Sequence, residues 1–317
     1  MPDRRGPRGA HRSSRQPATR PRRSRLRLAG LPAAAVALVA GTTLALASPP
    51  AGAATPIYLG AAGDEVALSQ SIGEPLSDHA YARFDQRVPQ ARMITVHGGT
   101  WRAVATAGSG STLHANIVRW ADTIKARGGR VLVAYHHEPE AKTDTSLGTS
   151  ADYIAAYRRV VDIFRGRGVQ NVLYTWQMTA WSFRAPSTDR RYAAKWYPGD
   201  RYVDVVGADA YNWYTCGAGT GKWREFSTLA DPVLAFARAR GKQAAFPEFG
   251  SITHPKRAEW LTNVHRYVVA NRTSIQALFY FHRPSTVAAY ADCRWPLSTP
   301  AEFKAYGDMA RSSHFAP

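Results

Sequence analysis

The sequence lacks the motifs of several common enzyme classes. It has no G-x-S-x-G segment, which excludes the nucleophile elbow of the α/β hydrolases. It also has no H-E-x-x-H segment, which disfavours zinc hydrolysis of the kind that this motif supports. No glycine-rich phosphate loop follows the first apolar strand, so nothing favours an open nucleotide-binding sheet.

Acidic residues are scarce. The chain of 317 residues has 23 Asp and Glu against 41 Lys and Arg, a formal net charge of +18. Residues 1–27 contribute half of that charge, because they hold ten arginines and a single acidic residue, Asp3. After Arg27 the basic residues are scattered and form no long run, so we expect no nucleic-acid partner.

A targeting segment accounts for the basic start of the chain. The arginine-rich region is followed by an apolar run, Leu28–Ala47, and then by the small residues Ala51–Ala54. This order predicts a secretory signal peptide over residues 1–53, with cleavage after Ala53 and a secreted product. Residues 22–26, RRSRL, resemble a twin-arginine signal, and a general-secretion signal is the alternative. Because proline and small residues end the apolar run, we expect no stable membrane anchor.

Cysteine is nearly absent, with only Cys216 and Cys293 in the whole chain. An exported protein meets an oxidising environment, so this pair predicts one disulfide. Two free buried thiols are the alternative.

The remaining segment, residues 54–317, has the length of one large α/β domain. Short apolar or β-branched runs alternate there with longer helical patterns, which indicates parallel strands joined by crossover helices. Eight strands in about 250 residues predict a single (β/α)8 TIM barrel. The expected strands are Ile57–Leu59, Ala80–Phe84, Met93–Val96, Val131–Tyr135, Val172–Trp176, Val203–Val206, Gln243–Phe246 and Ile275–Phe281.

Candidate functional residues follow from this architecture, because reactive groups of such barrels lie where strands end and βα loops begin. Glu138 and Glu248 follow the fourth and seventh strands, which face each other across the barrel. Two carboxyl groups that converge can hydrolyse a glycosidic bond, and a separation of about 5–5.5 Å indicates retention of configuration. The alternative is that both are satisfied structural residues. The other candidates at strand ends are His97, Trp101, His137, Trp176, Trp181, Tyr211, Trp213 and Phe281.

Three segments resemble glycoside hydrolase family 26, whose best-known members are endo-β-1,4-mannanases. Residues 135–138, YHHE, resemble the acid/base motif of the family. Residues 196–207 resemble the segment that enters its sixth strand, and residues 246–250, FPEFG, resemble its nucleophile strand. The resemblance extends from about Ile57 to the C-terminus.

This resemblance implies a retaining endo-β-glycanase without a cofactor, acting as a monomer on a polysaccharide. Glu138 would be the general acid/base and Glu248 the nucleophile. His137 would orient the acid and contact sugar hydroxyls, and Tyr211 would hydrogen-bond the nucleophile. Trp176 and Phe281 would line the cleft.

Two departures from the family pattern concern the substrate. Ala134 stands where mannanases often have arginine, and residues 139–141, PEA, replace Met-Asn-Gly. Mannan is the leading substrate, with β-1,3-xylan and mixed-linkage glucan as alternatives. A lectin-like barrel that binds glycans without cleaving them is the other class of function. A metal site is not expected, because the adjacent side chains of His136 and His137 should point to opposite sides of the barrel wall.

Overall fold

The computed structural model describes residues 56–142, 145–285 and 287–317. The expected signal peptide, residues 1–53, lies outside these ranges, so its boundary stays a prediction. Within the ranges, no helix is both long and apolar enough to cross a membrane.

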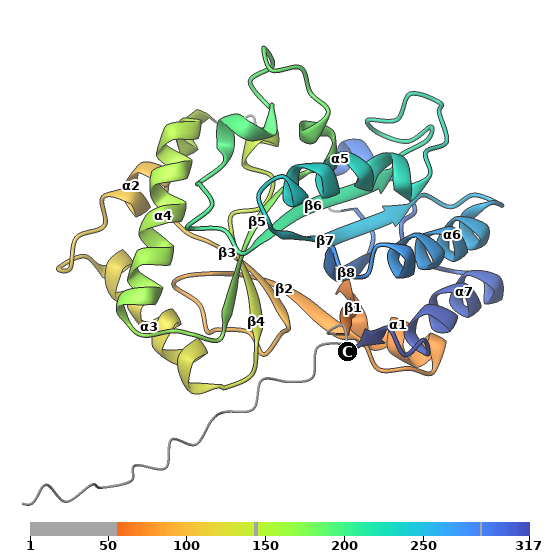
Figure 1. Cartoon of the computed structure of the whole chain (residues 1–317), viewed down its shortest axis with the longest axis horizontal. Coiled ribbons are helices and arrows are strands. Elements are labelled where there is room, and N and C mark those ends of the chain that lie inside the picture. Colours follow the sequence, from red (N-terminus) through yellow and green to blue (C-terminus); the bar gives the residue numbers. More distant parts are fainter. Residues whose placement is uncertain (1–55, 143–144, 286) are drawn as a thin grey trace, which may run out of the picture. The chain divides into compact units, whose positions relative to one another are not determined.

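Eight parallel strands form a closed barrel, in which each strand pairs with its neighbours in chain order and β1 pairs with both β2 and β8 (Figure 1). A short ninth strand pairs with the start of β1. The predicted (β/α)8 fold is therefore confirmed. The strands are β1 Ile57–Gly63, β2 Ser77–Arg83, β3 Met93–His97, β4 Val131–Tyr135, β5 Val172–Thr179, β6 Val205–Asn212, β7 Gln243–Ser251, β8 Ile275–His282 and β9 Phe315–Ala316.

The barrel can close only because one position of β1, Gly60, has no side chain. A Cβ atom on Gly60 would lie 2.2 Å from the carbonyl oxygen of Ser77 on β2 and 2.6 Å from the ring of Phe279 on β8. Glycine thus lets β1 and β2 approach each other over the interior ring of Phe279.

Helices cover the outside of the barrel and begin at side chains that cap them. Thr149 and Asp152 form a capping box at the start of α4, and Thr299 and Glu302 form one at the start of α7. The α-helices are α1 Glu65–Ile72, α2 Trp101–Ala105, α3 Thr112–Ala126, α4 Ser150–Gly166, α5 Phe226–Arg238, α6 Arg257–Ala270 and α7 Pro300–Ala310. The 3₁₀ turns are η1 Pro139–Ala141, η2 Thr145–Leu147, η3 Ala180–Phe183, η4 Ala193–Trp196 and η5 Ala288–Tyr290.

Apolar side chains pack in two layers, one inside the barrel and one between the strands and the helices. Two of the tryptophans expected at the cleft belong to the outer layer. Trp176 is fully buried against Phe183 and Phe236, because Gln177 takes the interior position and the side chains of a strand alternate. Trp101 is 1% exposed and packs on Tyr153 of α4. The expectation that Trp176 lines the cleft is therefore wrong, and Trp101 is too deeply buried for the substrate-binding role expected of it.

A buried ion pair fixes the loops after β7 and β8 to the start of α7. The guanidinium of Arg257 is fully buried and lies 2.7 Å from Oε2 of Glu302. It also donates to the carbonyl oxygens of Ser251, Trp295 and Pro296, so its donors are well used.

The predicted disulfide is present. It joins Cys216, after β6, to Cys293, after β8, with a Cα–Cα distance of 5.7 Å. Both loops lie at the carboxyl ends of the strands, so the bond connects two loops of the same rim.

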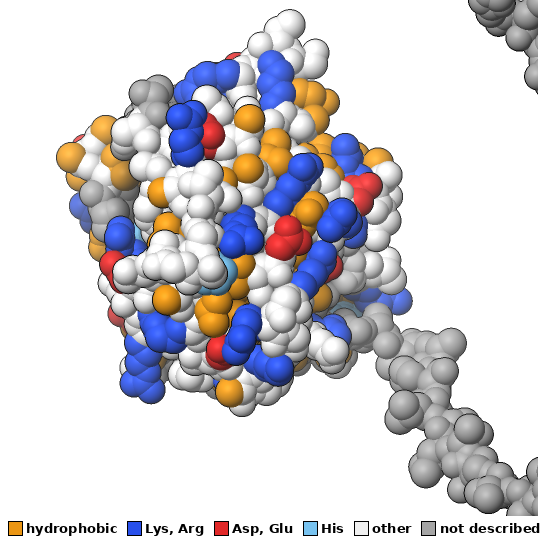
Figure 2. All heavy atoms as spheres, turned by 90° about the vertical axis from the view of Figure 1, so that its left-hand side faces the viewer, with side chains coloured by type: hydrophobic (Ala, Val, Ile, Leu, Met, Phe, Trp, Pro, Cys, Tyr) orange, Lys and Arg blue, Asp and Glu red, His pale blue; other side chains and the backbone are white. Residues whose placement is uncertain are grey.

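The charged surface agrees with the absence of a basic run. Lys and Arg side chains are spread over the face shown in Figure 2, and they do not gather into one patch.

Candidate active site

Glu248 lies at the carboxyl end of β7 and is 7% exposed. Its two carboxylate oxygens accept separate hydrogen bonds, one from the hydroxyl of Tyr81 on β2 and one of 2.5 Å from the hydroxyl of Tyr211 on β6. Burial raises the pKa of Glu248, and the two phenols oppose that rise, as does the positive charge of Arg283. Two donors on one carboxylate hold its orientation and favour its ionised form.

Glu138 lies in the loop after β4, as the third residue past the end of the strand, and its side chain is partly exposed. Its backbone has a left-handed conformation, with φ 46°, and its amide donates to the carbonyl oxygen of Gln177 on β5 at 3.0 Å. Burial, followed by the negative charges of Glu248 and Glu140, raises the pKa of Glu138 to about 8. Glu138 is therefore protonated at neutral pH and is close enough to Glu248 to respond to its charge.

A third carboxyl group, that of Asp209 on β6, is close enough to Glu248 and Glu138 for the charges of both to affect its pKa. Asp209 is the register partner of Glu248, after a shift in the β6–β7 ladder between Gly207 and Asp209. Burial and then the charges of Glu248 and Glu138 raise the pKa of Asp209 well above its ordinary value. The amide nitrogen of Gln177 donates to both oxygens of Asp209, at 2.8 and 3.0 Å.

The hydrogen bonds continue from Gln177 through the barrel interior. Thr95 of β3 donates to the amide oxygen of Gln177 at 3.0 Å, and its hydroxyl lies 2.9 Å from Nε2 of His79 on β2. Nδ1 of His79 lies 2.8 Å from the carbonyl oxygen of Pro247, the residue before Glu248. A chain of buried polar groups thus connects Asp209 with the backbone of the strand that bears Glu248.

Glu140 is a fully buried carboxyl group behind Glu138, in η1. One of its oxygens accepts hydrogen bonds of 2.7 Å from the amide and the hydroxyl of Thr179. Its other oxygen has no partner among the described residues. Burial raises the pKa of Glu140 to about 7, although the bonds from Thr179 oppose that rise.

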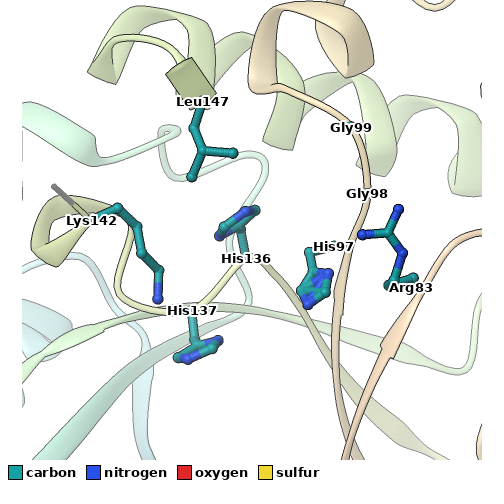
Figure 3. A pocket seen from close by; sticks show the side chains of 8 residues that line it. All are labelled: Arg83, His97, Gly98, Gly99, His136, His137, Lys142 and Leu147. Carbon is teal, nitrogen blue, oxygen red and sulfur yellow. The ribbon is translucent and has the colours of Figure 1, made fainter. Parts of the chain in front are cut away.

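A hollow of about 270 Å³ is lined by His137, the residue before Glu138. Figure 3 shows His97, His136 and His137 along it, with Lys142 extending toward His137 and the guanidinium of Arg83 on the opposite side. Burial is the main cause of a lowered pKa at each of the three histidines, and the value for His136 is about 3. The rings of Tyr81 and His137 meet edge to face at 5.6 Å, which brings the hollow next to the two glutamates.

Aromatic rings form the other side of the site. Tyr211 contacts Trp213, Phe281 and Trp295 with ring-centroid distances of 4.8 to 5.7 Å. Trp213 also meets Tyr290 at 5.0 Å, beside the disulfide that joins their two loops. Apolar ring faces at such a rim can pack against an apolar face of a ligand.

Trp181, in η3 after β5, is 38% exposed, and the guanidinium of Arg191 lies 4.0 Å from its ring centroid. Within the described ranges, Trp181 makes no contact with either glutamate, so the structure brings together only part of the expected set. That part comprises Glu138, Glu248, His97, His137, Tyr211, Trp213 and Phe281.

Sequence reasoning missed His79 because it placed the second strand at Ala80–Phe84, and it missed Tyr81 because the pattern of that strand did not show which side chains face the interior. The strand begins at Ser77, and its alternation puts the rings of His79 and Tyr81 inside the barrel. The sequence does contain a signal, because His79 and Tyr81 are two residues apart and so lie on the same face of a strand. The signal is weak, because this strand has few apolar residues.

The model of glycosyl hydrolase family 26 matches residues 112–272, which include both glutamates. The chain belongs to this family. Endoglucanase H of Acetivibrio thermocellus is 26% identical to it over 197 residues, 56% of this chain and 21% of that protein. A mannan endo-1,4-beta-mannosidase of Bifidobacterium adolescentis is 33% identical over 108 residues, 32% of this chain and 10% of that protein. This family 26 chain thus spans about a fifth of the first relative and a tenth of the second.

Solved structures also resemble this member of family 26. XacCel5A superposes with a TM-score of 0.55 at 12% identity, over 81% of this chain and 99% of that one, which agrees with the barrel fold. The catalytic domain of a family 26 endo-beta-1,4-mannanase from Bacillus sp. JAMB-750 has a TM-score of 0.47 at 20% identity, over 71% of this chain and 66% of that one.

Proposed function

We propose that this protein is a retaining endo-β-glycanase that hydrolyses β-1,4-mannan or a related β-linked polysaccharide. The observation that carries the proposal is the pair of glutamates from facing strands. Glu248 is held on both oxygens by Tyr81 and Tyr211, and Glu138 responds to its charge. Family membership and the names of the two relatives favour the same reaction and a mannan or glucan substrate.

In the proposed mechanism, Glu138 is the general acid. Its raised pKa keeps it protonated at neutral pH, so it can donate a proton to the oxygen of the leaving sugar. The edge-to-face contact of His137 with Tyr81 and its place directly before Glu138 support a role in orienting the acid and in contacting sugar hydroxyls.

Glu248 is the proposed nucleophile. The hydroxyls of Tyr81 and Tyr211 favour its carboxylate form and aim it, and Arg283 adds a positive charge nearby. Attack at the anomeric carbon expels the leaving sugar that Glu138 protonates. Glu138, now a carboxylate, then activates water to hydrolyse the glycosyl-enzyme.

Aromatic residues at the rim are the proposed sugar platforms. Trp213 and Phe281 flank Tyr211, and Trp181 extends from the loop after β5. His97, on the side of the hollow, is the remaining proposed binding residue.

We also propose that the enzyme is exported and acts outside the cell as a monomer. The basic and apolar order of residues 1–53 and the disulfide between Cys216 and Cys293 support export.

The test is release of reducing ends from mannan, glucomannan, xylan and mixed-linkage glucan. We expect product from at least one of them with the wild type, and none with Glu248→Ala. Glu259→Ala is the matched control, because Glu259 is an exposed glutamate on α6. Binding to these glycans without product from the wild type would favour the lectin-like alternative.

A further inference from the structure

The hollow that includes His137 is lined by positively charged side chains, which a neutral glycan would not need. We propose that it is a subsite for a sugar that bears a carboxylate, so that the enzyme acts on acidic or acid-substituted β-glycans. This inference rests on the proposed function, since it names the substrate class of the same site.

Among the described residues, the charged side chains that line the hollow are cationic. They are Lys142 and Arg83, and the described part of the lining contains no aspartate or glutamate. Within the described ranges, Nζ of Lys142 makes no hydrogen bond or ion pair. Nε of Arg83 lies 3.2 Å from the exposed carboxylate of Asp85, and no other side-chain bond of Arg83 is present there. Its two terminal nitrogens therefore remain available, and a planar guanidinium suits a carboxylate.

Two of the histidines that line the hollow each have a buried ring nitrogen without a hydrogen-bond partner. Nδ1 of His136 has no hydrogen-bond partner in the described part of the chain, although His136 is only 8% exposed, and the same is true of Nδ1 of His137. A buried polar group left unpaired costs about 1–3 kcal/mol, so such groups usually bind a ligand or water.

The size of the hollow fits one sugar residue. Its volume of about 270 Å³ lies just below the range of about 300–1,000 Å³ that is usual for drug-sized ligands. The hollow is therefore large enough for a single sugar residue of a glycan chain and too small for several. Because its raised pKa keeps Glu138 protonated at neutral pH, Glu138 does not repel a bound anion as an ionised carboxylate would.

Binding of two matched tetrasaccharides tests this inference. Glu248→Gln of the full chain is titrated by calorimetry with β-1,4-linked tetramannuronate and with mannotetraose, which differ only in the carboxylates. We expect the acidic tetrasaccharide to bind about tenfold more tightly, as charge-assisted hydrogen bonds imply. We also expect the preference to shrink in 0.5 M NaCl, about the range where charges are screened.

Arg83→Gln and Lys142→Gln, each in the Glu248→Gln background, should lower this preference by about threefold or more. Arg272→Gln is the matched control, because Arg272 is exposed in the loop before β8, at the opposite end of the barrel. Thermal melting checks that each variant is folded. Equal affinity for both tetrasaccharides, no binding of either, or a preference that survives both substitutions would overturn the inference.

Hydrolysis by the wild type separates this inference from the proposed function. Cleavage of mannan with no preference for acidic sugars would leave the proposed function and remove the subsite. Cation-dependent binding of the acidic tetrasaccharide with no cleavage of either would leave the subsite and remove the hydrolase.

Discussion

Tyr81 offers the sharpest test of how the nucleophile is held, because it was found from the structure and not from the motif. Tyr81→Phe removes the hydroxyl that donates to one oxygen of Glu248 and leaves the ring in place. A hydrogen bond to a charged group contributes about 1.5–3 kcal/mol, and one pKa unit corresponds to about 1.4 kcal/mol. The substitution should therefore raise the pKa of Glu248 by about one to two units.

The direction of the effect on activity follows from the proposed role. Glu248 must be ionised to attack, so the acidic limb of the kcat/KM profile should move to higher pH by about the same one to two units. Tyr211→Phe should move the same limb in the same direction, because Tyr211 donates to the other oxygen.

The assay is the pH dependence of kcat/KM on whichever glycan the panel identifies. Tyr267→Phe is the matched control, since its hydroxyl donates to Asp231 at 2.5 Å on the outer helices and neither limb should move. A Tyr81→Phe enzyme that loses activity equally at all pH values, with the acidic limb in place, would refute this account of Glu248.

Five further outcomes are expected. Because Glu138 must be protonated, kcat/KM should fall as the pH rises through about 8. Glu138→Ala should keep part of the rate of the first step on activated aryl glycosides, since a good leaving group needs little acid help. Equal loss of activity on activated and natural substrates would contradict this role. Trp176→Ala should cost about 3–5 kcal/mol of folding stability, measured by denaturant unfolding, and little substrate affinity at permissive temperature. Replacing Cys216 and Cys293 by serine should lower stability by about 2–4 kcal/mol in the same measurement. Arg257→Ala should cost about 3–5 kcal/mol, because it leaves a buried carboxylate without its partner, and an unchanged melting temperature would refute this.

The barrel could be predicted from the sequence because its strands are short apolar runs between glycine-terminated helices. Val131–Tyr135 was predicted with the bounds that the structure has, and Met93–His97 extends one residue past its prediction. The strands β5, β6 and β7 instead continue past their predicted ends, up to Thr179, Asn212 and Ser251, through segments that mix polar and apolar residues. The apolar pattern ends where the site begins, so it cannot show how far those strands extend.

The site could be predicted only in part, for a related reason. Motif spacing identified Glu138 and Glu248 as candidates, but it could not show which side of a strand an aromatic residue faces. Trp176 lies at a strand end and nevertheless packs on helices, since Gln177 has the interior position. Tyr81 lies on a strand with few apolar residues, so periodicity gave no reason to place its hydroxyl on Glu248.

Trapping of the glycosyl-enzyme tests the central claim most directly. Glu138→Ala is incubated with a dinitrophenyl β-glycoside of the preferred sugar. This substrate has a good leaving group, so the intermediate forms with little help from an acid. The variant lacks the base that would hydrolyse the intermediate, which therefore accumulates. Peptide mass mapping should then find one glycosyl adduct, on the peptide that carries Glu248. An adduct on another residue, or turnover that yields an inverted product with no adduct, would contradict the proposal that Glu138 and Glu248 act together in a double displacement.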